Sequence, residues 1–188
     1  MLRQLAGGTD EERWLAARAA AELPGAVAAL GEALARETSL RVRAAMFTAL
    51  ARIATPQSVE AVLPFLRSDD AEVRTEANDA LTAMKQVAWP YLEGLLQDRD
   101  RDVRIAACEL VRNMPSETAV RLFCDLLDSE LEPNVCAAAI DALAEIGGPQ
   151  ALPALTRCAT RFAATPFLAF SIKVAVERIR SQASVPRG

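Results

Sequence analysis

The chain has 188 residues, of which 52% are hydrophobic, and its formal net charge is -4. The acidic balance and the absence of a long Lys/Arg run argue against general affinity for DNA or RNA, which depends on a concentrated basic face. No stretch of 18 apolar residues lacks a charge, so we expect no membrane insertion.

A helix with one apolar pattern is predicted five times along the chain. Four copies align without gaps on Val42, Val73, Val103 and Val135, at intervals of about 31 residues. The apolar positions of each copy follow the spacing of one helix face, and alanine, the strongest helix former, fills many of them. The predicted first helices are Thr9–Leu23, Ser39–Ile53, Asp70–Met84, Asp100–Met114 and Glu132–Ile146.

Side chains that can cap a helix precede four of these helices. Thr9, Ser39, Asp70 and Asp100 occupy the same position, where a side-chain oxygen can accept a backbone N–H that has no partner inside the helix. Thr9 and Glu12 additionally match a capping box. Local chemistry therefore predicts where these helices begin.

A second, less regular helix follows each first helix. Pro64 lies deep enough to shorten or kink its helix, whereas Pro90 and Pro153 are expected near a first turn, where a missing N–H costs little. Gly147-Gly148 predicts a helix end. The predicted second helices are Gly25–Arg36, Pro56–Arg67, Gln86–Gln97, Ser116–Asp128 and Pro149–Arg161.

The paired helices predict an all-α fold, an α-α superhelix (right-handed α-solenoid) of about five helix pairs plus a closing helix at 165–181. A single domain is expected at 1–181, followed by a disordered tail at 182–188. The repeats are assigned to 9–37, 38–68, 69–98, 99–130 and 131–162.

The inner copies resemble short HEAT repeats of the phycobilisome-lyase type. Asp70–Met84 and Asp100–Met114 resemble the pattern D-x-x-V-R-x-x-A-x-x-A-L-x-x-I-G, and Ala151–Leu155 (ALPAL) resembles the helix that follows it. The resemblance implies HEAT-like pairs, a protein-interaction scaffold or adaptor, and a partner protein on the concave face formed by the second helices. It also permits a bilin lyase or isomerase subunit that handles a tetrapyrrole, although the chain lacks histidine, a common partner of pyrroles.

A repeated arginine is the sharpest polar feature, and the predicted ladder consists of Arg13, Arg43, Arg74 and Arg104. One interpretation is a cationic strip for an acidic partner. The favoured interpretation is structural: each guanidinium pairs with an inter-repeat acid such as Asp70 or Asp100, as the HEAT resemblance also implies. Asp and Arg four residues apart support the helix itself.

Polar and aromatic side chains on the second helices are the predicted binding surface. Trp89 and Tyr91 could anchor a partner or fill gaps beside small alanines, and both alternatives stay open. The predicted binding residues are Glu60, Trp89, Tyr91, Glu93, Arg121, Asp125 and Arg157.

Other aromatic residues gather toward the two ends of the chain. Phe162, Phe167 and Phe170 are expected to seal the open end of the stack, with a docking surface as the alternative. Trp14 is expected to cap the N-terminal repeat. Self-association through the ends is possible in such an array.

Several kinds of chemistry are not expected. The cysteines Cys108, Cys124, Cys136 and Cys158 are widely spaced and the chain has no histidine, so we predict no metal site and no cofactor. A serine or cysteine nucleophile would lack its usual base, so no catalytic residue is predicted. Isolated thiols without a signal peptide suit a reduced, cytoplasmic protein.

Overall fold

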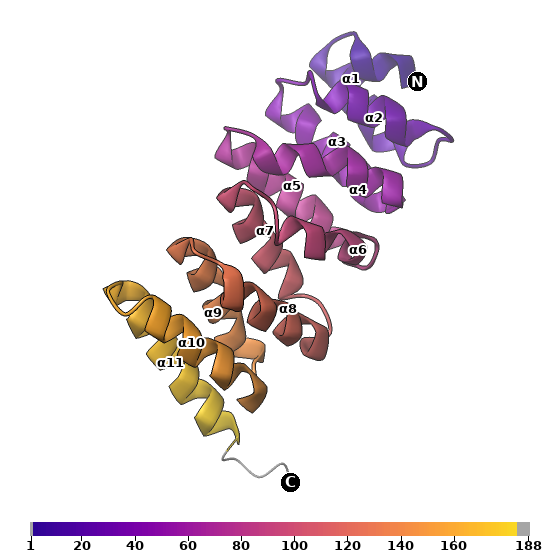
Figure 1. Cartoon of the computed structure of the whole chain (residues 1–188). Helices are drawn as coiled ribbons and strands as arrows, with labels where there is room; N and C mark the ends of the chain where they lie inside the picture. Colours follow the sequence, from indigo (N-terminus) through magenta and orange to yellow (C-terminus); the bar gives the residue numbers. More distant parts are fainter. Residues whose placement is uncertain (1, 184–188) are drawn as a thin grey trace. The chain divides into compact units, whose positions relative to one another are not determined.

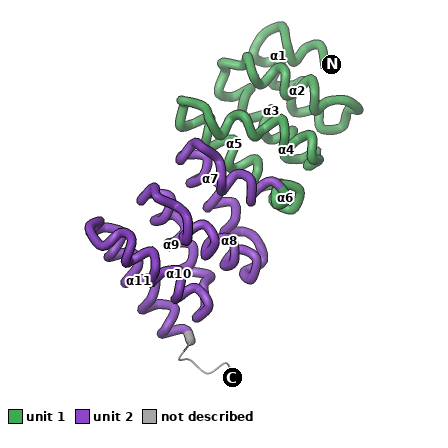
Figure 2. The backbone as a smooth tube through the Cα atoms, in the orientation of Figure 1, with its two compact units in different colours: residues 1–90 green, residues 91–188 purple. Residues whose placement is uncertain are grey.

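The computed structural model of the chain describes residues 2–183, which are mostly helical (Figure 1). These residues form eleven α-helices and three 3-10 helices and contain no strand. The chain divides into two compact units, residues 1–90 and 91–188 (Figure 2). The predicted all-α fold class is confirmed, and no helix in the described range is long and apolar enough to cross a membrane.

In the first unit, the first helices of successive repeats pack side by side in one layer, and the second helices form another. The first layer holds α1 (Asp10–Ala20), α3 (Leu40–Ile53) and α5 (Ala71–Ala83). The second layer holds α2 (Ala26–Leu34), α4 (Pro56–Val62) and the 3-10 helices η1 (Leu2–Ala6) and η2 (Leu63–Arg67). Val42, Met46 and Leu50 of α3 and Leu30 of α2 are fully buried in this core.

The second unit repeats this arrangement. Its first layer holds α7 (Arg101–Val111), α9 (Pro133–Ile146) and α11 (Pro166–Ala183). Its second layer holds α8 (Ser116–Ser129), the 3-10 helix η3 (Pro149–Ala151) and α10 (Leu152–Arg161). The helix α6 (Lys85–Leu95) spans the division between the units. The anchors Val103 and Val135 are fully buried, as the repeat pattern requires.

The predicted helix starts are confirmed. Thr9 and Glu12 form the capping box, and Asp70 and Asp100 accept the backbone N–H groups of Glu72 and Asp102. Ser39 occupies its predicted N-cap position without a side-chain hydrogen bond. Just before this helix, the Glu37 carboxylate accepts the backbone N–H groups of Thr38 and Ser39 at 3.0 and 2.8 Å.

Two of the three proline predictions are confirmed. The helix α4 ends at Val62 and continues as a 3-10 helix containing Pro64, so this proline shortens its helix. Pro153 lies in the first turn of α10. The prediction for Pro90 is wrong, because α6 begins at Lys85 and places this proline in the helix interior. The carbonyl of Gln86 therefore receives no hydrogen bond from residue 90.

Two predictions for the C-terminal end of the chain differ from the structure: the residues that seal it and the length of the closing helix. Leu168 and Ile172 are buried and seal this end, whereas Phe167 and Phe170 are exposed, so these two rings do not provide the seal. The helix α11 reaches Ala183, beyond the predicted closing helix. Residues 184–188 of the predicted tail lie outside the described residues.

Gly147 ends α9, and we expect Gly147→Ala to lower the free energy of unfolding by about 2 kcal/mol, the usual cost of overpacking. A Cβ atom there would collide with the carbonyl oxygen of Leu143 and lie 3.2 Å from Cδ1 of Ile179. The backbone φ angle of Gly147 is -72°, which any residue can adopt. Glycine is therefore required here because neighbouring atoms lie close, and not because the backbone is left-handed.

Urea unfolding followed by far-UV circular dichroism measures the effect. Gly94→Ala is the matched control, because Gly94 lies in α6 with nothing within 4 Å of the added atom. Gly94→Ala should instead raise the free energy of unfolding by up to about 1 kcal/mol, because alanine has the higher helix propensity. Equal effects of the two substitutions would contradict the close-approach argument.

Candidate functional site

The turn between the fourth and fifth repeats is held by Arg104 of α7. Its Nε donates to the Glu130 carboxylate at 2.6 Å and Nη2 donates to the same group at 3.1 Å. Its Nη1 donates to the backbone oxygens of Asp98 and Arg99 at 2.8 and 3.2 Å. Because both side chains are largely buried, this bidentate pair fixes the turn with little competition from water.

The Glu130 carboxylate also organises the chain that follows it. One carboxylate oxygen accepts the backbone N–H groups of Leu131 and Glu132 at 2.9 and 2.8 Å. Burial raises the pKa of Glu130, but the Arg104 guanidinium and the two N–H groups outweigh it, so the net pKa lies below the ordinary value. The group is therefore ionised at neutral pH.

Arg13 makes the corresponding contacts in the first unit. Its Nε and Nη2 donate to the Glu37 carboxylate at 2.8 and 3.0 Å, and Nη1 donates to the backbone oxygen of Gly8 at 2.9 Å. The pKa of Glu37 is lowered chiefly by the hydrogen bond from Arg13, against the opposing effect of burial. A bidentate arginine–glutamate pair thus holds a turn in each unit.

The other two ladder arginines contact different groups. Arg43 donates to Glu76 of the next first helix at 2.6 Å. Arg74 donates to the backbone oxygens of Ser68 and Asp69 at 2.6 and 3.1 Å. The side chains of Asp70 and Asp100, named as possible partners, cap helices, and the guanidiniums are held by glutamates and loop carbonyls.

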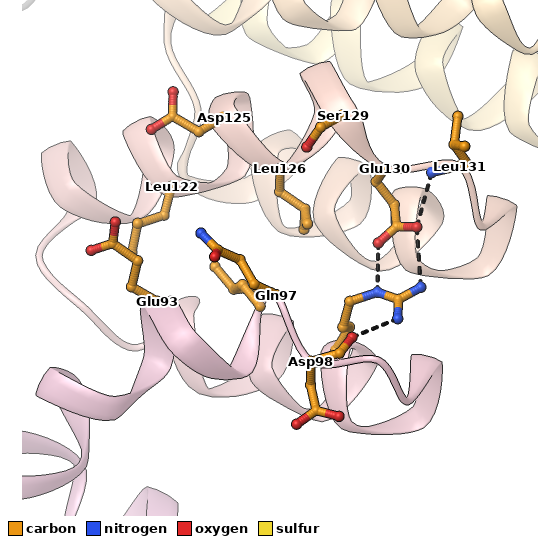
Figure 3. Close-up of a pocket in the computed structure, with 11 residues that line it drawn as sticks. Glu93, Gln97, Asp98, Leu122, Asp125, Leu126, Ser129, Glu130 and Leu131 are labelled. Carbon is orange, nitrogen blue, oxygen red and sulfur yellow. Dashed lines mark hydrogen bonds and ion pairs between the residues drawn. The ribbon is translucent and has the colours of Figure 1, made fainter.

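A groove of about 430 Å³ opens beside the Arg104–Glu130 pair in the second unit. The end of α6 and the segment after it form one wall, α8 forms the other, and the turn after α8 closes one end (Figure 3). Leu96, Leu122 and Leu126 are buried side chains that line it. Leu131 also lines the groove and is 73% exposed, which is unusual for a leucine.

The polar lining of this groove is mostly acidic. Glu93 and Asp125 are exposed carboxylates on the two walls, and Asp98 is half-buried on the α6 side (Figure 3). Arg104 is the basic member, and its charge is matched by Glu130. The lining therefore combines an apolar floor with surplus negative charge.

The predicted binding residues are distributed over both units. Glu93 and Asp125 line the groove, and Arg121 pairs with Asp125 at 3.3 Å along α8. Arg157 of α10 forms a pair with Asp128 of α8 at 2.8 Å, outside the groove lining.

The remaining predicted binding residues belong to α4 and α6. Glu60 is exposed on α4, and Tyr91 and Trp89 are half-buried on α6. The Trp89 Nε1 atom is buried and has no hydrogen-bond partner among the described residues. Neither ring lines the groove.

Sequence reasoning missed the leucines of the groove and the role of Glu130. Leu131 stands out because an apolar residue follows the last turn of α8 directly before the N-cap Glu132, a place where polar turn residues are usual. Glu130 could be found by comparison, because it precedes its N-cap by two residues, as Glu37 precedes Ser39. Within the described range, no group of three or more potential metal ligands is present.

Comparisons with solved structures agree with the fold. The chain resembles a structure titled "Structural Basis of Microtubule Plus End Tracking by XMAP215, CLIP-170 and EB1" at 15% identity, covering 94% of this chain and 88% of that chain with a TM-score of 0.62. It resembles a designed armadillo repeat protein in complex with peptide (KR)4 at 21% identity, 95% and 97% coverage, and a TM-score of 0.48. At such identities the likeness concerns the fold alone.

A comparison with family models is more decisive. No curated protein matches the chain. A family model for HEAT repeats matches residues 1–82, 27–103 and 90–164, in agreement with the repeated helix pairs described above. The chain belongs to the HEAT-repeat family.

Proposed function

We propose that the chain is a protein-interaction module whose second unit binds a basic, partly apolar segment of another protein. The observation that carries this proposal is the groove in which a leucine floor lies between acidic walls. Apolar side chains of the segment occupy the space above Leu122 and Leu126. Lys or Arg side chains of the segment pair with Glu93 at the rim and compete with Arg121 for Asp125.

The exposure of Leu131 supports this assignment. A leucine that is 73% exposed at the mouth of a groove adds apolar area that a partner can cover. The bidentate Arg104–Glu130 pair holds the adjoining turn in place, so binding need not order it. A preformed apolar floor and a charged rim match the usual anatomy of a peptide-binding site.

Titration of a fluorescently labelled peptide of lysine and leucine, followed by anisotropy, tests the proposal. We expect saturable binding that weakens with added salt, because the rim carboxylates are exposed. Glu93→Lys should weaken binding about tenfold, equivalent to about 1.4 kcal/mol, and Leu131→Ala should weaken it as well.

Glu117→Lys is the matched control. It makes the same charge change at an exposed position of α8 that lies outside the groove lining. A similar loss in Glu93→Lys and Glu117→Lys would show that binding follows net charge and not the groove, and would reject the proposal.

A further inference from the structure

A second groove, of about 610 Å³, lies in the first unit on the first helices α1 and α3. Its apolar lining comes from small side chains of α3 and from the ring of Trp14. Three arginines line it as well: Arg18 of α1 and Arg41 and Arg52 of α3. In character it is the reverse of the groove in the second unit, because its surplus charge is positive.

Two guanidiniums lie over the ring of Trp14. The Cζ atoms of Arg18 and Arg41 lie 4.7 and 4.1 Å from the centre of the Trp14 ring, within the range of a cation–π contact. A guanidinium over a ring face keeps its edge N–H groups available for hydrogen bonds, and Arg41 uses one of its own on Glu11. The Trp14 ring therefore brings two positive charges together at the groove.

The three cations are neutralised only in part. Arg41 of α3 pairs with Glu11 of α1 at 2.8 Å, and Arg52 of α3 pairs with Glu22 in the turn after α1 at 2.8 Å. Arg18 is exposed, and among the described residues no carboxylate lies within ion-pair distance of it. One full positive charge and the unused N–H groups of two further guanidiniums therefore face the groove.

The repeat register shows that the fold does not require these cations. The position of Arg18 in α1 is occupied in the later first helices by Thr48, Asp79, Glu109 and Asp141. The position of Arg41 in α3 is occupied in the next two by Glu72 and Asp102. All of these are exposed side chains, so Arg18 in the first repeat and Arg41 in the second are basic where the later repeats carry acidic or neutral residues at the same positions.

We propose that this groove binds an acidic peptide segment of a partner protein. Planar guanidiniums match carboxylates in bidentate geometry, and Trp14 with the neighbouring alanines provides a face for one apolar side chain of the segment. Glu11 and Glu22 favour a peptide over a nucleic acid, because evenly spaced phosphates would meet these two carboxylates, whereas the spacing of acids in a peptide can avoid them.

The test uses the full chain and an acetylated, labelled peptide of glutamate and leucine, with binding followed by anisotropy. We expect saturable binding that Arg18→Glu weakens at least tenfold, because an attractive charge becomes a repulsive one. Asp79, Glu109 and Asp141 occupy the same repeat position, so the acidic substitution is compatible with the helix. Circular dichroism of Arg18→Glu checks folding, and Arg18→Gln provides a milder second variant.

Arg36→Glu is the matched control, because it makes the same charge change in the first unit at an exposed position outside the groove. In a Trp89→Phe background Trp14 is the sole tryptophan, and its emission should change on binding. Equal weakening by Arg18→Glu and Arg36→Glu, or unchanged Trp14 emission at saturation, overturns the proposal. Tighter binding of a single-stranded oligothymidylate that displaces the peptide also overturns it, in favour of a nucleic-acid site.

Discussion

Replacing Glu130 by glutamine is expected to lower the free energy of unfolding by about 3 kcal/mol, measured by urea denaturation with circular dichroism. The buried carboxylate accepts two hydrogen bonds from Arg104 and two from the backbone of the following turn. Glutamine keeps the shape but removes the charge and directs an NH₂ group toward these donors. The Arg104 guanidinium is then left buried without its counter-ion, and this accounts for most of the loss.

Asp141→Asn serves as the control, because it also removes one carboxylate that pairs with an arginine. Asp141 lies 2.9 Å from Arg112 but its side chain is 71% exposed, so its loss should cost less than about 1 kcal/mol. Comparable losses in the two variants would show that the buried position of Glu130 has no special role.

The pH dependence gives an independent check on the same residue. The folded-state pKa of Glu130 is depressed, so its contribution is fully present above the unfolded-state pKa, near 4.5, and is lost as the pH falls through the lower folded value. The stability difference between the native chain and Glu130→Gln should therefore shrink in acid. A constant difference across this range would contradict the ionic origin of the effect.

Replacing Phe123 by alanine is expected to lower the free energy of unfolding by about 4 kcal/mol. Phe123 lies on α8, is fully buried, and is among the largest side chains with no solvent exposure. Its truncation removes a ring from a packed core and leaves a cavity that the helices cannot fully close. The same denaturation experiment measures the loss.

Leu131→Ala is the matched control for this cavity. It also truncates an apolar side chain in the second unit, but one that is 73% exposed, so stability should change by no more than about 0.5 kcal/mol. The two variants separate folding from binding, because Leu131→Ala is expected to weaken peptide binding while leaving the fold intact. A loss below about 1 kcal/mol for Phe123→Ala would mean that the core of this unit repacks freely.

The first helices could be predicted because their determinants are local. The anchors repeat at a nearly constant interval and are buried as the pattern requires: Val42, Val73, Val103 and Val135. Helix starts follow from Thr9 and Asp70, since a cap depends only on residues within the same turn. Periodicity and capping together were sufficient for the fold class.

The binding groove could not be predicted to the same extent, because its lining joins segments from different repeats. Glu93 and Asp125 were named as exposed polar residues, but the leucine floor and the Arg104–Glu130 pair depend on how helices far apart in sequence pack. For Trp14, the guanidinium of Arg41 comes from the next repeat and could not be placed from the sequence, whereas Arg18 lies one turn along the same helix. The tetrapyrrole alternative and self-association stay predictions.

The cysteines are confined to the second unit, so their chemical reactivity can be used to follow the opening of that unit alone. All of them lie within residues 91–188: Cys108, Cys136 and Cys158 are buried, and Cys124 is half-buried. Burial raises the pKa of the Cys108 thiol to about 12, so its reactive thiolate is scarce while the unit is closed. In a Cys124→Ser variant, the rate of cysteine alkylation would therefore report how often the second unit opens. Opening of the first 90 residues would not change this rate directly, because they contain no cysteine.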